Sequence, residues 1–219
     1  MSRQKLKKFA ENQARTNVIQ PGKELFNQIK GGWNELYFKN TAPLILELGC
    51  GRGEYTVGMA CLNPENNYVG VDIKGDRIWK GSKTAEHEGL SNVAFLRTQV
   101  QSLDNFFAPD EADEIWLTFP DPRPKKRDIK RRMTHPRFMD IYRRLLKSGG
   151  KLHLKTDNDQ LFQYTLEIVL EMTGVRALTA TDNLYQSRLM DPVLEIRTHY
   201  EVLFAKQGFS IKYLSFEFE

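Results

Sequence analysis

Short apolar runs alternate with longer stretches of mixed polarity along most of the chain. Seven runs have the length and composition of strands, at 44–48, 68–73, 93–96, 114–119, 151–156, 175–180 and 211–218. The stretches at 54–61, 76–87, 136–147 and 159–172 are suited to helices. Strands and helices in alternation are typical of a parallel sheet with crossover helices. The pattern predicts an α/β, Rossmann-like fold with a seven-stranded, mostly parallel sheet and helices on both faces.

One predicted helix, at 136–147, carries signals at both ends. Thr134 stands just before it, where a hydroxyl group can cap the first turn. Gly149 and Gly150 follow it, and glycine is the usual residue after a helix. We therefore expect the helix to begin after Thr134 and to end at the glycine pair.

Residues 1–40 have weak periodicity and many polar side chains, although Trp33, Leu36, Tyr37 and Phe38 could anchor them to the body. This predicts a flexible basic arm and a docked segment over 1–40, followed by one main domain over 41–219.

Composition narrows the class of protein. With 219 residues, of which 40% are hydrophobic, the chain can bury a sizeable core. It has no apolar run of membrane-spanning length and no apolar leader, so we expect a cytoplasmic protein that does not enter the membrane. Its two cysteines, Cys50 and Cys61, form no CxxC pattern, and neither a disulfide nor a metal site is expected.

The net charge of +4 conceals an uneven distribution. Residues 123–132 hold seven of the 32 lysine and arginine residues and one of the 28 aspartate and glutamate residues, so the remainder of the chain is slightly acidic. The first thirty residues hold a second excess of bases. Local basic patches on an acidic body predict a phosphate-binding surface.

A glycine-rich loop, Glu47-Leu48-Gly49-Cys50-Gly51-Arg52-Gly53, joins the first main strand to the next helix. This is where α/β sheets bind nucleotide-like ligands, and Gly49 and Gly51 let the backbone approach the ligand closely. Glu47 and Glu54 flank the loop and would repel a pyrophosphate. They suit a ligand with an ammonium and a sulfonium group, as in S-adenosylmethionine, although Glu54 more simply complements the helix dipole.

Two further side chains follow the next two strands. Asp72 can accept hydrogen bonds from both ribose hydroxyls of a nucleoside. Gln99 is a candidate for the adenine edge, because its amide oxygen can accept from the exocyclic amine. Cys50 is expected to be only a small packed residue.

Asp121 lies between two prolines at the end of the fourth main strand, and the basic run begins two residues later. Prolines restrict the backbone, so Asp121 should be held rigidly at the edge of the sheet that carries the glycine loop. Phosphates held by Arg127, Lys130, Arg131 and Arg132 would then lie near that loop.

Four motifs together resemble the bacterial tRNA (guanine-N7-)-methyltransferases over about residues 25–219: ELGCGRG, FPDPRPKKR, Lys155-Thr156-Asp157-Asn158 and Thr198-His199-Tyr200-Glu201. The resemblance implies a class I methyltransferase fold, S-adenosylmethionine as methyl donor, and methylation of guanine 46 in the variable loop of tRNA.

The resemblance also implies roles for single residues. Matched positions in the donor site are Glu47, Asp72, Gln99 and Asp121, with Asp121 as the catalytic residue. Matched positions that engage the substrate are Lys125, Asp157, Thr198, His199, Tyr200 and Glu201. Without the resemblance, Thr198, Tyr200 and Glu201 would be read as capping and packing residues. This chain has Arg123 and Asp128 where the family commonly has tryptophan and histidine.

Methylation at guanine N7 does not require Asp121 to act as a base. Guanine N7 has an in-plane lone pair and no proton to lose, so methyl transfer needs alignment more than a base. A fixed carboxylate can stabilise the cationic product ring and accept hydrogen bonds from guanine. Asp121, and with it Asp157, is expected to act in positioning and electrostatics.

Other functions remain open at this point. An amino-methyltransferase for adenine or cytosine of nucleic acid would also combine prolines with a carboxylate, but with an aromatic residue in place of Arg123. A non-catalytic RNA-binding module is disfavoured by the intact carboxylates, and a dehydrogenase by Glu47 and Glu54. The sequence allows either a monomer or a homodimer.

Overall fold

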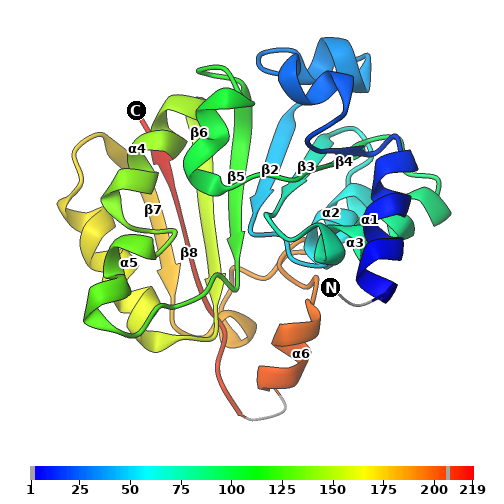
Figure 1. Ribbon diagram of the computed structural model, residues 1–219. Helices are drawn as coiled ribbons and strands as arrows, with labels where there is room; N and C mark the ends of the chain where they lie inside the picture. The colour runs from blue at the N-terminus through cyan, green and yellow to red at the C-terminus, as the bar shows by residue number, and fades with distance from the viewer. Residues whose placement is uncertain (1–2, 206–207) are drawn as a thin grey trace.

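Eight strands form one sheet at the centre of the computed structural model, which describes residues 3–205 and 208–219 (Figure 1). In chain order the strands are β1 (Val18–Ile19), β2 (Leu44–Leu48), β3 (Asn67–Val71), β4 (Val93–Leu96), β5 (Ala112–Thr118), β6 (Leu146–Thr156), β7 (Val175–Thr181) and β8 (Lys212–Phe218). Their order across the sheet is β1-β4-β3-β2-β5-β6-β8-β7. The pairs from β1 to β6 are parallel, and β8 is antiparallel to both β6 and β7.

Helices cover both faces of this sheet. The longer ones are α1 (Arg3–Ala14), α2 (Glu54–Leu62), α3 (Gly75–His87), α4 (Pro136–Leu145), α5 (Asp159–Glu171) and α6 (His199–Ala205). Shorter helical segments are η1 (Glu24–Asn27), η2 (Trp33–Phe38), η3 (Val100–Asn105), η4 (Lys126–Arg131) and η5 (Leu184–Gln186). None of the helices in the described part of the chain is long and apolar enough to cross a membrane.

Alternation along β2 divides the core into two layers. Leu44, Leu46 and Leu48 face the layer that contains α4, α5 and η3, whereas Ile45 faces the layer of α2 and α3. The segment at 184–196 completes the second layer. Because β2 to β6 are parallel, the loops that follow them meet at one edge of the sheet, and α6 lies below that edge in Figure 1.

The predicted fold class is confirmed, with one strand more than the seven expected. The additional strand, β1, pairs Val18 with Phe95 and Ile19 with Leu96 at the edge of the sheet. Two residues give no detectable alternation, so the pattern of apolar positions could not identify this strand.

Where the sequence predicts a flexible arm at the N-terminus, the structure has helix α1 from Arg3 to Ala14. Helix α1 packs against α3, and the buried Asn12 amide donates to the Gly75 carbonyl oxygen at 2.7 Å. The expected anchor is present: Trp33 is fully buried and its indole nitrogen donates to the Phe106 carbonyl oxygen at 2.9 Å. Residues 1–2 of the predicted arm lie outside the described residues, and the boundary at residue 40 stays a prediction.

Helix α4 begins at Pro136 as predicted, but its predicted cap and its predicted end were wrong. His135 caps the helix, since its Nδ1 accepts from the Arg137 backbone N–H at 3.3 Å. The helix ends at Leu145, and the chain continues directly into β6, which contains Gly149 and Gly150. The Thr134 hydroxyl group is buried and accepts from the Thr165 hydroxyl group at 2.8 Å.

We predict that Gly53→Ala destabilises the protein more than Gly89→Ala, although both glycines have left-handed φ values of 70° and 66°. A Cβ at Gly53 would lie 2.5 Å from the buried Phe95 ring, whereas one at Gly89 would meet nothing within 4 Å. Overpacking should lower the free energy of unfolding at Gly53 by about 1–3 kcal/mol beyond the loss at Gly89. Urea denaturation measures both losses, and equal losses would contradict this account.

Candidate active site

The glycine loop turns sharply after β2 and is fixed to the end of β3. Gly49 and Gly51 have φ values of 75° and 56°, which favour glycine. The Gly49 backbone N–H donates to the Val71 carbonyl oxygen at 2.8 Å. Asp72 accepts from the backbone N–H groups of Gly51 at 3.0 Å and Lys74 at 2.8 Å. The predicted ribose-binding carboxylate thus also shapes the loop.

Glu47 lies beneath this loop and connects three elements. It is 1% exposed, on the face of β2 covered by α2. Its carboxylate accepts from the Thr56 backbone N–H of α2 at 2.8 Å and from the Thr56 hydroxyl group. Its other oxygen accepts from the Thr118 hydroxyl group at the end of β5 at 2.5 Å. Burial raises the pKa of Glu47 to about 7, although these hydrogen bonds oppose the rise.

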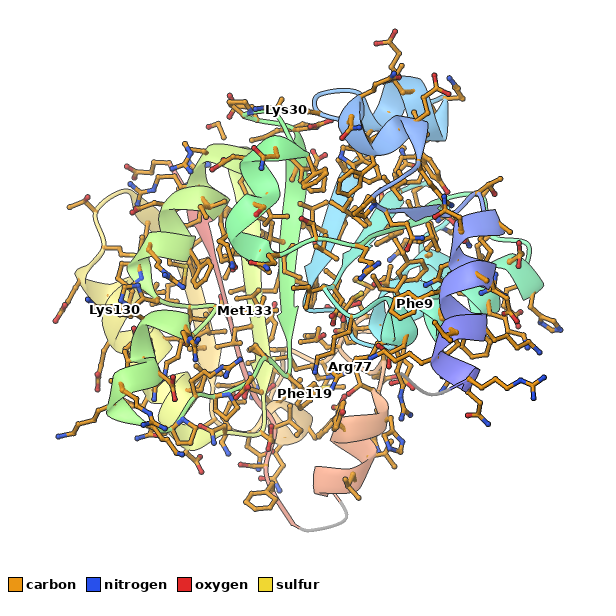
Figure 2. All side chains as sticks on the ribbon, in the orientation of Figure 1. Phe9, Lys30, Arg77, Phe119, Lys130 and Met133 are labelled. Atoms are coloured by element: carbon orange, nitrogen blue, oxygen red, sulfur yellow. The ribbon has the colours of Figure 1, made fainter. Side chains whose placement is uncertain are left out.

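Asp121 follows β5 on a turn with an unusual backbone. Phe119 and Arg123 both have left-handed φ values, 49° and 46°, which are uncommon outside glycine. The Phe119 backbone N–H donates to the Lys155 carbonyl oxygen of β6 at 2.8 Å, and Figure 2 shows Phe119 at the edge where β5 ends. The Asp121 side chain is 61% exposed and pairs with Arg123 Nε at 3.2 Å.

Gln99 lies after β4 at the same edge of the sheet. Its side chain is exposed and its oxygen accepts from the Gln101 amide. Glu54 begins α2, pairs with Lys80 at 3.2 Å and accepts from the His199 backbone N–H at 2.8 Å. Cys50 is buried, and burial raises the pKa of its thiol well above the usual value, which agrees with its interpretation as a packed residue.

The basic run is largely exposed, with one exception. Lys125 and Lys130 are exposed, as are the side chains of Arg127 and Arg131, at 79% and 66%. Arg132 was expected to contact RNA, but it is 3% exposed and its guanidinium group binds backbone carbonyl oxygens. This burial does not favour the expected contact, because a count of charges does not show which side chains point inward.

Thr198 and Glu201 form the N-terminal cap of α6. The Glu201 backbone N–H donates to the Thr198 hydroxyl oxygen at 3.2 Å, and the Thr198 backbone N–H donates to the Glu201 carboxylate at 3.4 Å. This reciprocal pair is a capping box. Thr198 is 8% exposed and Glu201 fully buried, so neither side chain is free to contact a substrate in this arrangement. The capping interpretation holds for these two positions.

A buried ion pair fixes this cap to the sheet. Lys155 Nζ, near the end of β6, lies 3.0 Å from the Glu201 carboxylate, and both side chains are 0% exposed. The ammonium group also donates to the carbonyl oxygens of Leu194 and Ile196. Tyr185 donates its hydroxyl group to the same carboxylate. Lys155 was not singled out as a separate site residue, although a lysine inside an apolar strand was a usable signal of a buried ion pair.

The remaining predicted substrate residues lie near the same edge. Asp157 follows β6, and burial raises the pKa of its carboxyl group. His199 and Tyr200 begin α6, and Tyr200 is 42% exposed. The site thus brings Asp72, Asp121 and Asp157 to the carboxyl ends of β3, β5 and β6, at one edge of the sheet.

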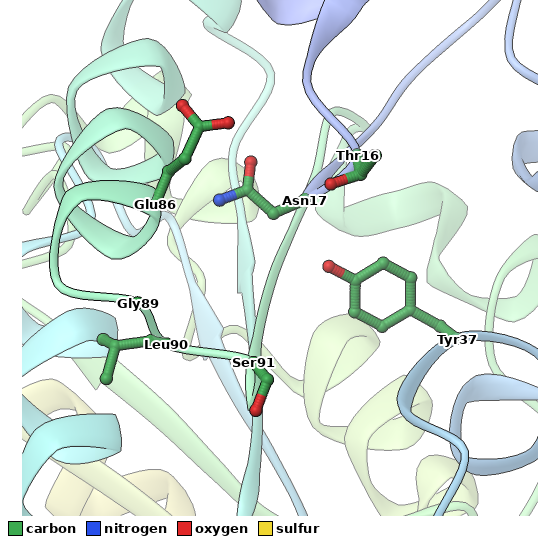
Figure 3. Close-up of a pocket in the computed structure, with 7 residues that line it drawn as sticks. All are labelled: Thr16, Asn17, Tyr37, Glu86, Gly89, Leu90 and Ser91. Atoms are coloured by element: carbon green, nitrogen blue, oxygen red, sulfur yellow. The ribbon is translucent and has the colours of Figure 1, made fainter.

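Two cavities differ in their relation to this edge. One, of about 400 Å³, lies beside the glycine loop and is lined by Lys8, Gly51, Arg52, Asp76, Arg77, Trp79, Lys80 and Tyr200. The other, of about 420 Å³, lies near the starts of β1 and β4 and includes Asn17, Tyr37 and Ser91 (Figure 3). No predicted site residue lines the second cavity. No group of three or more metal-ligating side chains occurs within residues 3–205 and 208–219.

Comparison with known proteins agrees with this architecture. A 16S rRNA methyltransferase, KamB, superimposes with a TM-score of 0.60 at 14% identity, over 91% of this chain and 95% of that one. The family model described as a putative methyltransferase matches residues 41–214. The fold is therefore that of the class I methyltransferases.

Relatives at higher identity define the family more narrowly. The tRNA (guanine-N(7)-)-methyltransferase of Cytophaga hutchinsonii is 51% identical over 219 residues, which is 100% of this chain and 99% of that protein. The enzyme of the same name from Christiangramia forsetii is 44% identical over 99% of this chain and 98% of its own length. The chain belongs to the tRNA (guanine-N(7)-)-methyltransferase family.

We predict that Glu47→Gln alters the dependence of stability on pH. The unfolded chain releases this proton near pH 4.5, but the folded protein retains it to about pH 7. Between these values the folded state binds more protons, so its free energy of unfolding falls as pH rises, by roughly 3 kcal/mol from this group alone. Glu47→Gln removes that part of the fall.

Urea denaturation at about pH 5 and about pH 8 measures the difference. Glu65→Gln, at an exposed position, is the matched control and should follow the native protein. Parallel curves for the native protein and Glu47→Gln would show that Glu47 is not protonated abnormally.

Proposed function

We propose that this protein transfers a methyl group from S-adenosylmethionine to N7 of a guanine in tRNA, and that the target is guanine 46 of the variable loop. One observation carries the proposal: Asp72, the glycine loop and Asp121 lie at one edge of the sheet, beside the exposed lysine and arginine side chains of the basic run. The names of the relatives support the substrate. With tRNA as substrate, the cytoplasm is the expected compartment.

The donor set agrees with S-adenosylmethionine. Gly51 presents open space, since a Cβ there would meet only the Gly49 carbonyl oxygen, at 3.9 Å. Asp72 is 9% exposed and follows β3, a position from which its carboxylate can bind a ribose. Gln99 is exposed after β4 and is the proposed adenine contact. Glu47 contributes from beneath the loop, through its hydrogen bonds rather than by direct contact.

Asp121 acts on the guanine. When bound, the donor supplies a methyl group on a sulfonium sulfur, which becomes a neutral thioether as the guanine N7 lone pair takes the methyl group. The purine ring gains a positive charge, and no proton leaves N7. Asp121 can stabilise this charge and orient the base by accepting hydrogen bonds, and Asp157 is placed to assist.

Arg123 changes partner in this scheme. An exposed pair such as Arg123 with Asp121 is typically worth at most about 1 kcal/mol, so its separation costs little. An RNA phosphate would attract the guanidinium group and leave the carboxylate to the guanine. Lys125, Arg127, Lys130 and Arg131 are proposed to hold further phosphates, and His199 and Tyr200 are the proposed contacts from α6.

The direct test is incubation of the protein with labelled S-adenosylmethionine and unmodified tRNA, followed by mapping of the modified base. We expect one N7-methylguanine at position 46 and no product when that guanine is replaced by adenine. A tRNA with a neighbouring guanine replaced is the matched control and should be methylated normally. Product on an exocyclic amine would contradict the proposal.

Asp121→Asn should keep the shape of the side chain and remove its charge. We expect kcat to fall by about 10²–10³-fold, because a fixed charge that stabilises a transition state is typically worth this much. Asp140→Asn, at an exposed position on α4, is the control and should keep its kcat. Full activity of Asp121→Asn at saturating donor and tRNA would remove the assigned role.

A further inference from the structure

Arg132 ends the basic run, yet it faces the protein interior. Its Nε donates to the Pro122 carbonyl oxygen at 3.0 Å, and its Nη2 donates to the Arg123 carbonyl oxygen at 3.4 Å. The guanidinium group lies over the Tyr164 ring of α5, 4.4 Å from the centroid. No carboxylate forms an ion pair with Arg132 in the part of the chain that the structure describes. The charge is therefore held by carbonyl groups and an aromatic face.

The two carbonyl groups belong to the residues that directly follow Asp121. Arg123 has a left-handed φ of 46°, a conformation that costs a non-glycine residue about 1–2 kcal/mol. A planar guanidinium group that binds both carbonyl oxygens holds this turn in its strained form. The arrangement thereby limits the directions in which the Asp121 carboxylate can point.

The next residue connects the same segment to the donor loop. A Cβ placed on Gly49 would meet Met133 Sδ at 3.4 Å, so the Met133 side chain lies against the glycine loop. The Met133 carbonyl oxygen accepts from the Tyr142 hydroxyl group of α4 at 3.0 Å. Consecutive residues therefore contact the turn of Asp121 and the loop of the donor site, and α5 supports the first contact and α4 the second.

We propose that Arg132 is a positioning residue for methyl transfer. It fixes the Pro122–Arg123 turn and with it the Asp121 carboxylate relative to the glycine loop, and it does not hold an RNA phosphate. The inference rests on the proposed function, since the quantity that it controls is the rate of methyl transfer to tRNA.

The test separates kcat from the KM for tRNA. Arg132→Met should lower kcat by about 10²-fold, because a small displacement of a catalytic group can cost this much. Its KM for tRNA, and the decrease of tRNA affinity with salt, should stay as in the native protein. Arg132→Lys should recover part of the rate, because an ammonium group can still donate to one of the two carbonyl oxygens.

Arg131→Met is the contrasting variant, since Arg131 is exposed in the same run. It should raise the KM for tRNA and reduce the logarithmic salt slope of tRNA binding by about one. Arg144→Met is the matched control: this arginine of α4 pairs with Asp104 at 2.7 Å, away from the site, and its loss should change neither quantity.

Two results with Arg132→Met would each overturn the inference. One is an unchanged kcat, and the other is a raised KM for tRNA with a flattened salt dependence, as expected of Arg131→Met. If Arg132→Met does not fold, Tyr164→Leu replaces it, because it removes the aromatic face from a partly exposed position and leaves the charge. Tyr164→Leu should lower kcat at unchanged salt dependence, and an unchanged kcat would overturn the inference. Inactivity of the native protein on tRNA would instead contradict the proposed function.

Discussion

The candidate active site is organised around one buried carboxylate. Glu47 joins the glycine loop and α2, through Thr56, to the end of β5, through Thr118. Backbone pairing of β2 with β5 brings these elements into register, but the side chain of Glu47 connects the two segments that must cooperate. Burying it is costly, and the raised pKa is the measure of that cost. The distance between the donor loop and the Asp121 turn thus depends on an interaction that faces away from solvent.

Buried and exposed cationic side chains have different partners in this protein. Buried cations, such as Lys155 and Arg132, bind backbone carbonyl groups and fix loops, whereas Arg127 and Arg131 are exposed and pair only with the neighbouring Asp128 among the interactions of the described residues. Lysine and arginine therefore fix the positions of loops where they are buried, and they can attract a polyanion where they are exposed. A desolvated arginine keeps a strong orienting effect, while an exposed one is screened by salt.

The fold was predictable because most strands are apolar runs of four residues or more, and the stretches between them have the mixed polarity of helices that pack on a sheet. The prediction failed where a signal was too short or ambiguous, as in the two residues of β1 and in the glycine pair that lies inside β6. Within the site, the glycine loop, Asp72 and Asp121 could be found from their places after strands. The inward orientation of Arg132 and Glu201 could not, because it depends on partners that are distant in sequence, Tyr164 and Lys155.

The capping box of α6 divides a four-residue motif into two pairs. Thr198 and Glu201 point inward and are committed to the cap and to Lys155, whereas His199 and Tyr200 project from the first turn of the helix. The motif thus joins two anchoring positions to two exposed ones. Substitutions at the middle two positions leave the cap intact, while the outer two can change only together with the strand that anchors them.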